Sequence, residues 1–310
     1  MADASLLRIA TAPVNWNNSD LPGWREHVPF PRILDEMVRA GYRESEYDTS
    51  LGSDLEEISK EMTKRAMSFC GAYFWIDTQD TAAFERDLAS VSTRCRLLQR
   101  IGCHHLVVSD VLRPLRVAVA GSVPPDGSLA LDVEGYSTMA DRLRQVAAVG
   151  AVHDIAVHYH NHAGTLIETP QELDALVDAL GGTGVDLCFD TGHYVFGGGD
   201  AAAFVEDHAD RIGYVHLKDV DPGVLATGRT LHWGLLDALR HIVFPPLGTG
   251  SADIRGIVRL LVDNRFGGYV VIEQDTCKGD PTETARANLE FVVAASESSG
   301  QQGTQQEDAP

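Results

Sequence analysis

The sequence predicts an α/β protein that folds as a single (β/α)8 TIM barrel over residues 1–295, and three observations lead to this fold class. Strand-like and helix-like segments alternate along the 310-residue chain, and no Pro/Gly/Ser-rich linker divides them. Eight such pairs occupy about 290 residues, roughly 36 residues each, which suits a closed barrel. Several strand ends carry polar side chains, whereas an open doubly wound sheet would concentrate its site at one switch point.

Eight short apolar runs are the candidate strands, and amphipathic helical patterns lie between them. The clearest helix places five apolar residues on one face, at positions i, i+4, i+7, i+11 and i+14: Phe84, Leu88, Val91, Cys95 and Leu98. The candidate strands cover residues 6–13, 43–48, 68–74, 104–109, 155–161, 185–190, 212–218 and 269–274.

Three helix starts are marked by residues that cap a helix N-terminus. Thr169-Pro170-Gln171-Glu172 forms a capping box with proline at the first helical position. Asp280-Pro281-Thr282-Glu283 repeats this pattern before the last helix, and Asp54 begins a similar one early in the chain. Each cap follows a strand end, where a loop should lead into the next helix.

Three segments depart from the regular repeat. Residues 14–28 form a long first βα loop with two tryptophans, and residues 219–246 form a second long loop after the seventh strand. Long loops in a compact barrel are usually lids or binding loops. The tail, residues 296–310, is rich in Ser, Gly, Gln and Glu without apolar spacing, so we expect it to be disordered.

Composition and charge exclude several classes of protein. The net charge of −20 argues against a nucleic-acid partner and against an anionic membrane surface, because both need a dense basic footprint. The five cysteines include no Cys-x-x-Cys pair and fit reduced, buried thiols. No apolar run approaches the roughly 18 residues of a membrane span, and no signal segment opens the chain. We therefore expect a cytoplasmic protein, with a homo-oligomer left open.

Four polar clusters, each closing an apolar run in the second half of the chain, predict an enzyme. They read Val-His-Tyr-His-Asn-His (157–162), Cys-Phe-Asp-Thr-Gly-His (188–193), Tyr-Val-His-Leu-Lys-Asp (214–219) and Val-Val-Ile-Glu-Gln-Asp (270–275). In a barrel these strand ends meet at one face. Imidazole and carboxylate ligands without thiolates suit Mn²⁺, Co²⁺, Zn²⁺ or Mg²⁺.

The residues of these clusters have competing interpretations. Asp190 is a metal or catalytic residue, although it could also cap a helix. His216 and Glu273 are functional candidates, because an ionisable group that ends an apolar strand is costly to bury without a partner. His160 is a ligand or a substrate contact, whereas His158, deeper in the barrel, fits a core residue.

Three more residues are candidates for acid/base or substrate roles. His193 and Lys218 follow the sixth and seventh strands, and Glu46 ends the second in Glu-Ser-Glu-Tyr. His104 and His105 begin their strand, so they should lie at the opposite end of the barrel and have no part in the site.

The motifs Phe-Asp-Thr-Gly-His and His-Leu-Lys-Asp and the closing strand glutamate resemble the xylose-isomerase-like sugar phosphate isomerase/epimerase superfamily. The resemblance is closest to the inosose (2-keto-myo-inositol) dehydratases. It is carried by Ala12-Pro13 with Trp16-Asn17-Asn18-Ser19-Asp20, by Gly41-Tyr42 leading to Glu46, and by residues 158–165. It covers most of residues 6–295.

The resemblance implies one divalent metal, usually Mn²⁺ or Co²⁺, at the ends of strands five to eight. Asp190, His216 and Glu273 fall on three ligand positions of the superfamily. The usual ligand of the fifth strand is a glutamate, and His160 stands nearest that place, with Glu168 as the alternative. The segment Arg43-Glu44-Ser45 also departs from the small, Gly-containing approach that the family usually has before its glutamate.

This chemistry leads to two reactions. A metal-polarised ketone lets a carboxylate or histidine, such as Glu46 or Glu273, remove the neighbouring C–H proton to give an enediolate. If His193 or Lys218 then protonates a β-hydroxyl, the enzyme is a dehydratase of inosose or a related keto-polyol. If the proton returns to carbon, it is a sugar isomerase or epimerase. Three weaker hypotheses for the function are a C-glycoside-cleaving subunit, a metal nuclease and a non-catalytic barrel.

The expected partner is a small sugar or cyclitol rather than a phosphorylated compound, because no Gly-rich anion site stands out near strands seven and eight. The long loops at 14–28 and 219–246 should determine specificity. The expected substrate contacts are Asn15, Trp16, His162 and Trp233, with Trp24 as a further apolar wall.

Overall fold

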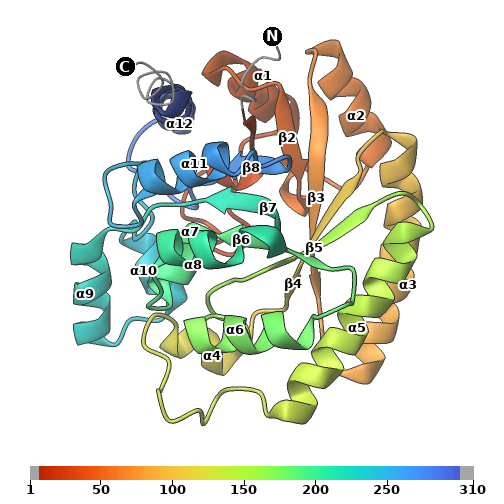
Figure 1. The fold of residues 1–310 in the computed structure, drawn as a ribbon. Helices are drawn as coiled ribbons and strands as arrows, with labels where there is room; N and C mark the ends of the chain where they lie inside the picture. Colours follow the sequence, from red (N-terminus) through yellow and green to blue (C-terminus); the bar gives the residue numbers. More distant parts are fainter. Residues whose placement is uncertain (1–6, 301–310) are drawn as a thin grey trace, which may run out of the picture.

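The computed structural model describes residues 7–300, which form a closed barrel of eight parallel strands surrounded by helices (Figure 1). Pairing of β1 with β8 closes the sheet, from Arg8↔Tyr269 to Thr11↔Ile272. The predicted fold class and all eight predicted strands are confirmed. The strands are β1 (Arg8–Thr11), β2 (Glu44–Tyr47), β3 (Ser68–Ile76), β4 (His105–Asp110), β5 (Ala156–His160), β6 (Asp186–Asp190), β7 (Ile212–Leu217) and β8 (Tyr269–Ile272).

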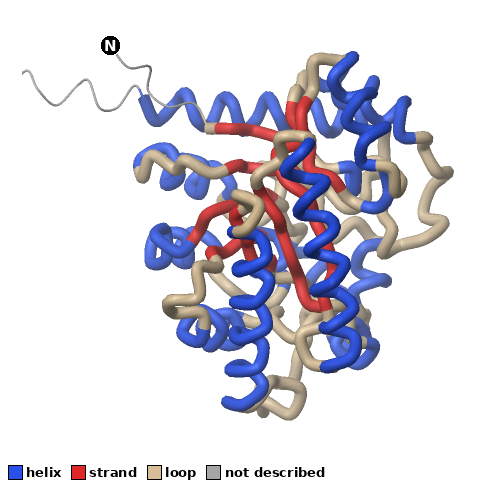
Figure 2. The backbone as a smooth tube through the Cα atoms, turned by 90° about the vertical axis from the view of Figure 1, so that its right-hand side faces the viewer, coloured by secondary structure: helices blue, strands red, loops and turns tan. Residues whose placement is uncertain are grey.

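The helices lie outside the strands (Figure 2), and the longer ones contribute buried apolar residues to the main core. The predicted capping box of α6 is present: Glu172 N–H donates to Thr169 Oγ1, and Thr169 N–H donates to Glu172 Oε2. The α-helices are α1 (Phe30–Ala40), α2 (Leu55–Lys64), α3 (Thr81–Arg100), α4 (Pro114–Val119), α5 (Val133–Ala151), α6 (Pro170–Ala179), α7 (Thr191–Phe196), α8 (Ala201–His208), α9 (Pro222–Leu231), α10 (Leu235–Arg240), α11 (Ile254–Asp263) and α12 (Pro281–Gly300). Three 3-10 turns join them: η1 (Pro13–Asn15), η2 (Thr49–Leu51) and η3 (Ala209–Arg211).

Two expectations about the less regular segments are wrong. Residues 219–246 are not an extended loop but contain α9 and α10, and Asp221 caps α9 with Pro222 at its first position. The chain also keeps its helical order beyond residue 295, because α12 continues to Gly300 and buries Ser296, whose hydroxyl donates to the Val293 carbonyl. Residues 301–310 of the expected tail lie outside the described residues. Within residues 7–300, no helix combines the length and the apolar character that a bilayer crossing requires.

The amino-terminal end of the barrel interior holds a histidine pair. His105 stacks on His158 with ring centroids 5.2 Å apart, and His105 Nδ1 lies 3.0 Å from His158 Nε2. Burial lowers the pKa of His105 to about 4 and that of His158 to about 3, so neither ring is charged at neutral pH. Their position supports the interpretation of His158 as a core residue, and neither histidine is among the residues that line the pocket at the carboxyl ends of the strands.

One register irregularity lies directly before a candidate site residue. The pairing of β2 with β3 shifts between Ser45 and Glu46. Such a shift bends a strand locally and changes the direction of the next side chain. Here Glu46 is buried and lines the pocket at the carboxyl ends of the strands.

Candidate active site

A pocket opens at the carboxyl ends of the strands, where the sequence placed its polar clusters. Its walls are the first βα loop, the end of β3 and the ends of β2, β5, β7 and β8. Asp190 and His193 are buried directly behind these walls. The lining nearest the barrel axis consists of Asn17, Asn18, Ser19, Asp20, Glu46, Tyr73, Trp75, His160, His162, His216, Lys218, Glu273 and Asp275.

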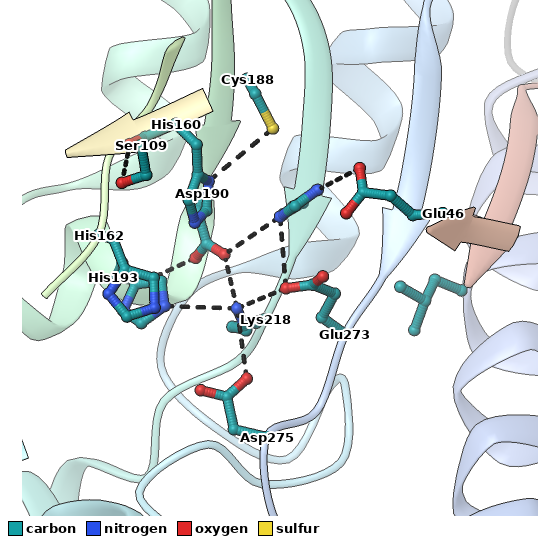
Figure 3. A network of polar contacts seen from close by, with 12 residues as sticks. Glu46, Ser109, His160, His162, Cys188, Asp190, His193, Lys218, Glu273 and Asp275 are labelled. Carbon is teal, nitrogen blue, oxygen red and sulfur yellow. Dashed lines mark hydrogen bonds and ion pairs between the residues drawn. The ribbon is translucent and has the colours of Figure 1, made fainter. Parts of the chain in front are cut away.

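Lys218 stands at the centre of the site, surrounded by carboxylates (Figure 3). Its Nζ lies 3.0 Å from Asp190 Oδ2, 2.6 Å from Glu273 Oε2 and 3.3 Å from Asp275 Oδ1. Burial opposes the charge, but the three acids hold the pKa of Lys218 well above its usual value. Lys218 is therefore an ammonium ion that donates to Asp190 and Glu273, lies 3.3 Å from His193 Nε2 and forms an ion pair with Asp275.

His216 lies among three acids. Its Nδ1 is 3.3 Å from Glu273 Oε2 and 4.0 Å from Asp190 Oδ2, yet it has no hydrogen-bond partner among the described residues. Its Nε2 lies 3.3 Å from Glu46 Oε1. Burial opposes ionisation of Glu273, but His216 and Lys218 hold the pKa of Glu273 well below its usual value.

These donor atoms fit a divalent cation. A buried imidazole nitrogen without a partner faces two carboxylate oxygens, which together make a typical N/O ligand set. The pairing of Glu46 with the other ring nitrogen matches the carboxylate that commonly orients a ligating histidine. The Cys188 thiol lies nearby, with its sulfur 3.8 Å from His160 Nδ1, and in the absence of a cation burial raises its pKa to about 12.

Three buried imidazoles form a second group beside this one. Ligand nitrogens of His160, His162 and His193 lie within 4.8 Å of one another, and the rings of His162 and His193 are 3.8 Å apart. His162 Nδ1 lies 2.7 Å from the Ala163 carbonyl, which leaves Nε2 as an acceptor. Burial lowers the pKa of His162 to about 3, so its ring is neutral.

The first turn of α7 fixes Asp190. As N-cap residue, Asp190 accepts a hydrogen bond from His193 N–H at 2.7 Å, so the helix start joins these two side chains. The side chain of Asn161 makes two hydrogen bonds to the backbone of Asp190 and so links β5 to β6. Thr191 makes a similar pair of bonds with the backbone of Lys218. The ends of three neighbouring strands are therefore locked together.

Two further clamps hold the remaining loops. Asp219 accepts four backbone N–H bonds of 2.8–3.0 Å, which tie the segment before α11 to the end of β7; the donors are Val220, Gly248, Gly250 and Ala252. Asn15 accepts from Gln274 N–H at 2.7 Å, and Asn18 donates to the Asp275 carbonyl at 3.1 Å. The first loop thus fixes the backbone that carries Glu273 and Asp275.

Comparison with known proteins identifies the family of this chain. The family model described as "Xylose isomerase-like TIM barrel" matches residues 33–295. The chain belongs to this family. Among curated members of the xylose isomerase-like family, an inosose dehydratase of Clostridium perfringens is 29% identical over 290 residues, which cover 93% of this chain and 97% of that protein.

Solved structures of xylose isomerase-like barrels share the fold. An L-ribulose 3-epimerase superposes with a TM-score of 0.70 at 16% identity and covers 98% of this chain and 100% of its own. The IolI protein with a bound zinc atom superposes with a TM-score of 0.68 at 12% identity and covers 94% and 99%. At these identities the likeness establishes the barrel alone.

The structure brings together most of the site residues that the sequence suggested, but not all. Glu46, His160, His162, Asp190, His193, His216, Lys218 and Glu273 meet in one place. Glu168, the alternative ligand, does not reach it, because its carboxylate accepts N–H bonds from Gly121 and Gly164.

Three residues that we expected to contact substrate also lie outside the pocket. Trp16 is fully buried in the main core, Asn15 holds the β8 backbone, and Trp233 stacks on His241, 3.9 Å between ring centroids. Within the described residues 7–300, neither these three side chains nor that of Trp24 lines the pocket. A tryptophan in a long loop does not reveal whether it faces the pocket or anchors the loop.

Sequence reasoning missed several lining residues. Asp275 was available as the same-parity neighbour of Glu273 on β8, and Asn18 and Asp20 belong to a segment already singled out. Tyr73 and Trp75 gave no distinct signal, because alternation in an apolar strand does not tell which face is inside. In the structure their rings pack edge-on against His160 and His162.

Proposed function

We propose that the protein is a divalent-metal-dependent dehydratase of inosose or a related cyclic keto-polyol. The relatives named inosose dehydratase support this reaction, and the structure supplies groups for its two halves. The observation that carries the proposal is that Glu46 contacts Nε2 of His216, while Lys218 donates to Glu273, the acid that faces Nδ1 of the same ring. One carries a carboxyl group and the other an amine, and both line the same pocket.

We infer that Asp190, His216 and Glu273 hold the ion, with His160 as the fourth ligand. Mn²⁺ and Co²⁺ are the preferred candidates, and Zn²⁺ is also compatible because the similar IolI barrel contains it. A divalent ion there would polarise the ketone and the adjacent hydroxyl and so acidify the neighbouring C–H.

The side chains of this chain then divide the proton transfers. Glu46 accepts the C–H proton next to the ketone, since its carboxylate lines the pocket and uses only Oε1 on His216. Lys218 gives a proton to the β-hydroxyl, the C–O bond breaks and water leaves. Proton exchange with solvent restores both groups. The substrate loses one water and no electrons, and His162 accepts a hydroxyl hydrogen to orient the ring.

The charge of the pocket supports an unphosphorylated substrate. Six acidic side chains line it against Arg94, Lys218 and the imidazole of His216, and Lys218 is already paired with acids. A phosphate or a nucleic-acid backbone would meet net repulsion there. A neutral sugar or cyclitol would instead use the acids as hydroxyl acceptors.

An isomerase or epimerase is the second candidate. It needs the same proton removal, and the structural likeness to an L-ribulose 3-epimerase is what favours it. The two reactions differ only in whether the proton returns to carbon or water leaves.

The deciding assay follows both steps together. Metal-stripped protein, reconstituted with Mn²⁺, is incubated anaerobically with 2-keto-myo-inositol in D₂O, quenched with chelator and examined by NMR. Metal-dependent loss of water that disappears in Asp190→Asn supports the dehydratase. Deuterium incorporation without loss of water favours the isomerase or epimerase. If neither water loss nor deuterium incorporation is observed, inosose is not the substrate.

A further inference from the structure

The active-site pocket extends well beyond the barrel axis. Its cavity of about 220 Å³ adjoins a second cavity of about 310 Å³ beside α3. A single cyclitol ring with twelve non-hydrogen atoms needs only a part of this space. The outer part of the pocket is lined by Asp48 and Thr49 after β2, by Phe74 of β3, and by Asp87, Ser90, Val91 and Arg94 of α3.

This outer part continues into a groove between η2 and α3. An adjoining cavity shares Thr49, Ser90 and Arg94 with the pocket and runs on past Tyr47 and the start of α2 at Leu55. The floor is apolar, since Phe74 and Val91 are buried. A ligand held at Lys218 therefore has an open path along which a substituent can extend.

Arg94 is arranged as a donor on one wall of this outer part. Its guanidinium lies 3.9 Å from the Phe74 ring centroid, and Nε donates to Ser90 Oγ at 3.0 Å. Among the described residues, no carboxylate lies within ion-pair distance of it. The four terminal N–H hydrogens of a flat, stacked guanidinium are well placed to bind oxygen atoms of a ligand.

Asp48 is an acceptor on another wall of the same outer part. Its Oδ1 accepts from Ser50 N–H at 2.6 Å, while the carboxyl group still lines the pocket. Asp87 adds a second carboxyl group to this outer part. Donor, acceptor and apolar floor together match the hydroxyls and the C–H face of a sugar ring.

We propose that Asp48, Phe74 and Arg94 form an outer subsite that binds a second hydroxylated ring, so that the substrate is an O-glycosylated or similarly substituted keto-polyol. The ring that reacts lies at Lys218 and the substituent lies toward α3. This inference rests on the proposed function for the inner ring, but it concerns a separate part of the pocket.

Binding calorimetry with unreactive probes tests the subsite independently of turnover. The probes are myo-inositol, galactosyl-myo-inositol and an inositol monophosphate, titrated into the Mn²⁺-loaded protein. We expect the galactosyl compound to bind at least about tenfold more tightly than myo-inositol, which is roughly the effect of one good hydrogen bond. Arg94→Met, which keeps the apolar stem of the side chain, should remove that difference and leave myo-inositol binding unchanged.

The matched control is Arg86→Met on the exposed side of the same helix, which should keep the tenfold preference. Absent or equal binding of the galactosyl compound would overturn the subsite, as would a preference that survives in Arg94→Met. If the inositol monophosphate binds more tightly than the galactosyl compound, the outer subsite binds an anionic group and not a second sugar ring. A failed inosose assay with a retained galactosyl preference would overturn the proposed reaction alone.

Discussion

Glu46 Oε1 lies 3.3 Å from His216 Nε2, although the two residues are 170 positions apart in the chain. The contact crosses the barrel interior from β2 to β7, and the shift in strand pairing just before Glu46 accompanies it. Because the other nitrogen of His216 faces Glu273 and Asp190, Glu46 determines how this ring presents itself to a cation. Glu46 thus has two proposed roles, as the proton acceptor and as the partner of a metal ligand.

Glu46→Gln should weaken divalent-metal binding by about 10- to 100-fold, because the carboxylate that orients His216 is lost. Chelator competition with Mn²⁺ or Zn²⁺ measures this directly. Glu44→Gln is the matched control: Glu44 is on the same strand but accepts from Tyr269 at the opposite end of the barrel. Unchanged metal affinity in Glu46→Gln would show that His216 does not depend on this contact.

Lys218→Met should separate the two halves of the reaction. The substitution removes the proposed acid but not the proposed base, so loss of water should fall by about 10²- to 10⁴-fold while C–H exchange into D₂O continues. Deuterium incorporation and product formation in the same sample give both rates. Parallel loss of the two rates would contradict the assignment of Lys218 as the leaving-group acid. Lys64→Met, on the surface, serves as control.

Asp219→Ala should destabilise the protein by about 2–4 kcal/mol, because backbone N–H groups that bond to this buried carboxylate lose their partner. Urea unfolding followed by circular dichroism measures the change. Asp221→Ala removes an exposed helix cap and should cost only about 1 kcal/mol. Equal losses in the two variants would refute the idea that Asp219 clamps the segment before α11.

Stability should fall as the pH drops below about 6.5. The pKa of His105 is lowered from 6.5 to about 4 by burial, so the folded state binds fewer protons than the unfolded chain in this interval. The stabilisation is complete above pH 6.5 and is lost progressively toward pH 4. In His105→Gln the decline, measured by urea unfolding at pH 7, 6 and 5, should be shallower. An unaltered pH profile would exclude His105 as a cause; His104→Gln, partly exposed, is the control.

The two tryptophans near the site should respond differently to replacement. Trp16→Ala should cost about 3–5 kcal/mol of stability, because it empties a fully buried position. Trp75→Ala should instead raise KM with a smaller loss of stability, since this ring lines the pocket beside His162. Thermal unfolding and steady-state kinetics distinguish the two cases. An increase in KM for Trp16→Ala equal to that for Trp75→Ala would restore Trp16 as a substrate contact.

The fold was predictable because its signals are local and repeated. Alternating periodicities mark eight strands, and caps such as Thr169 and Asp280 mark the helix starts. The shared location of Asp190, His216 and Glu273 followed from one rule, that parallel strand ends meet at one face. Asp221 before Pro222 carried a similar signal for α9, although the surrounding segment resembled a loop.

Side-chain direction was not predictable to the same degree. Nothing local shows that Asn15 faces the β8 backbone while Asn18 and Asp20 line the pocket. Glu168 has the composition of a ligand, yet the distant amide of Gly121 occupies one of its oxygens. These outcomes depend on contacts between segments far apart in the chain, which a single sequence does not encode in any spacing.

Hydrogen bonds connect the first βα loop to the backbone that follows the last strand. The bonds from Asn15 and Asn18 to the backbone at Gln274 and Asp275 span 259 and 257 positions. Contacts between segments so far apart carry the largest loop-closure entropy and tend to form late in folding. A growing chain on the ribosome therefore carries β1 to β7 without an ordered Glu273. Catalytic competence should appear abruptly, when the final strand inserts beside the first, and truncation of α12 or β8 should abolish it.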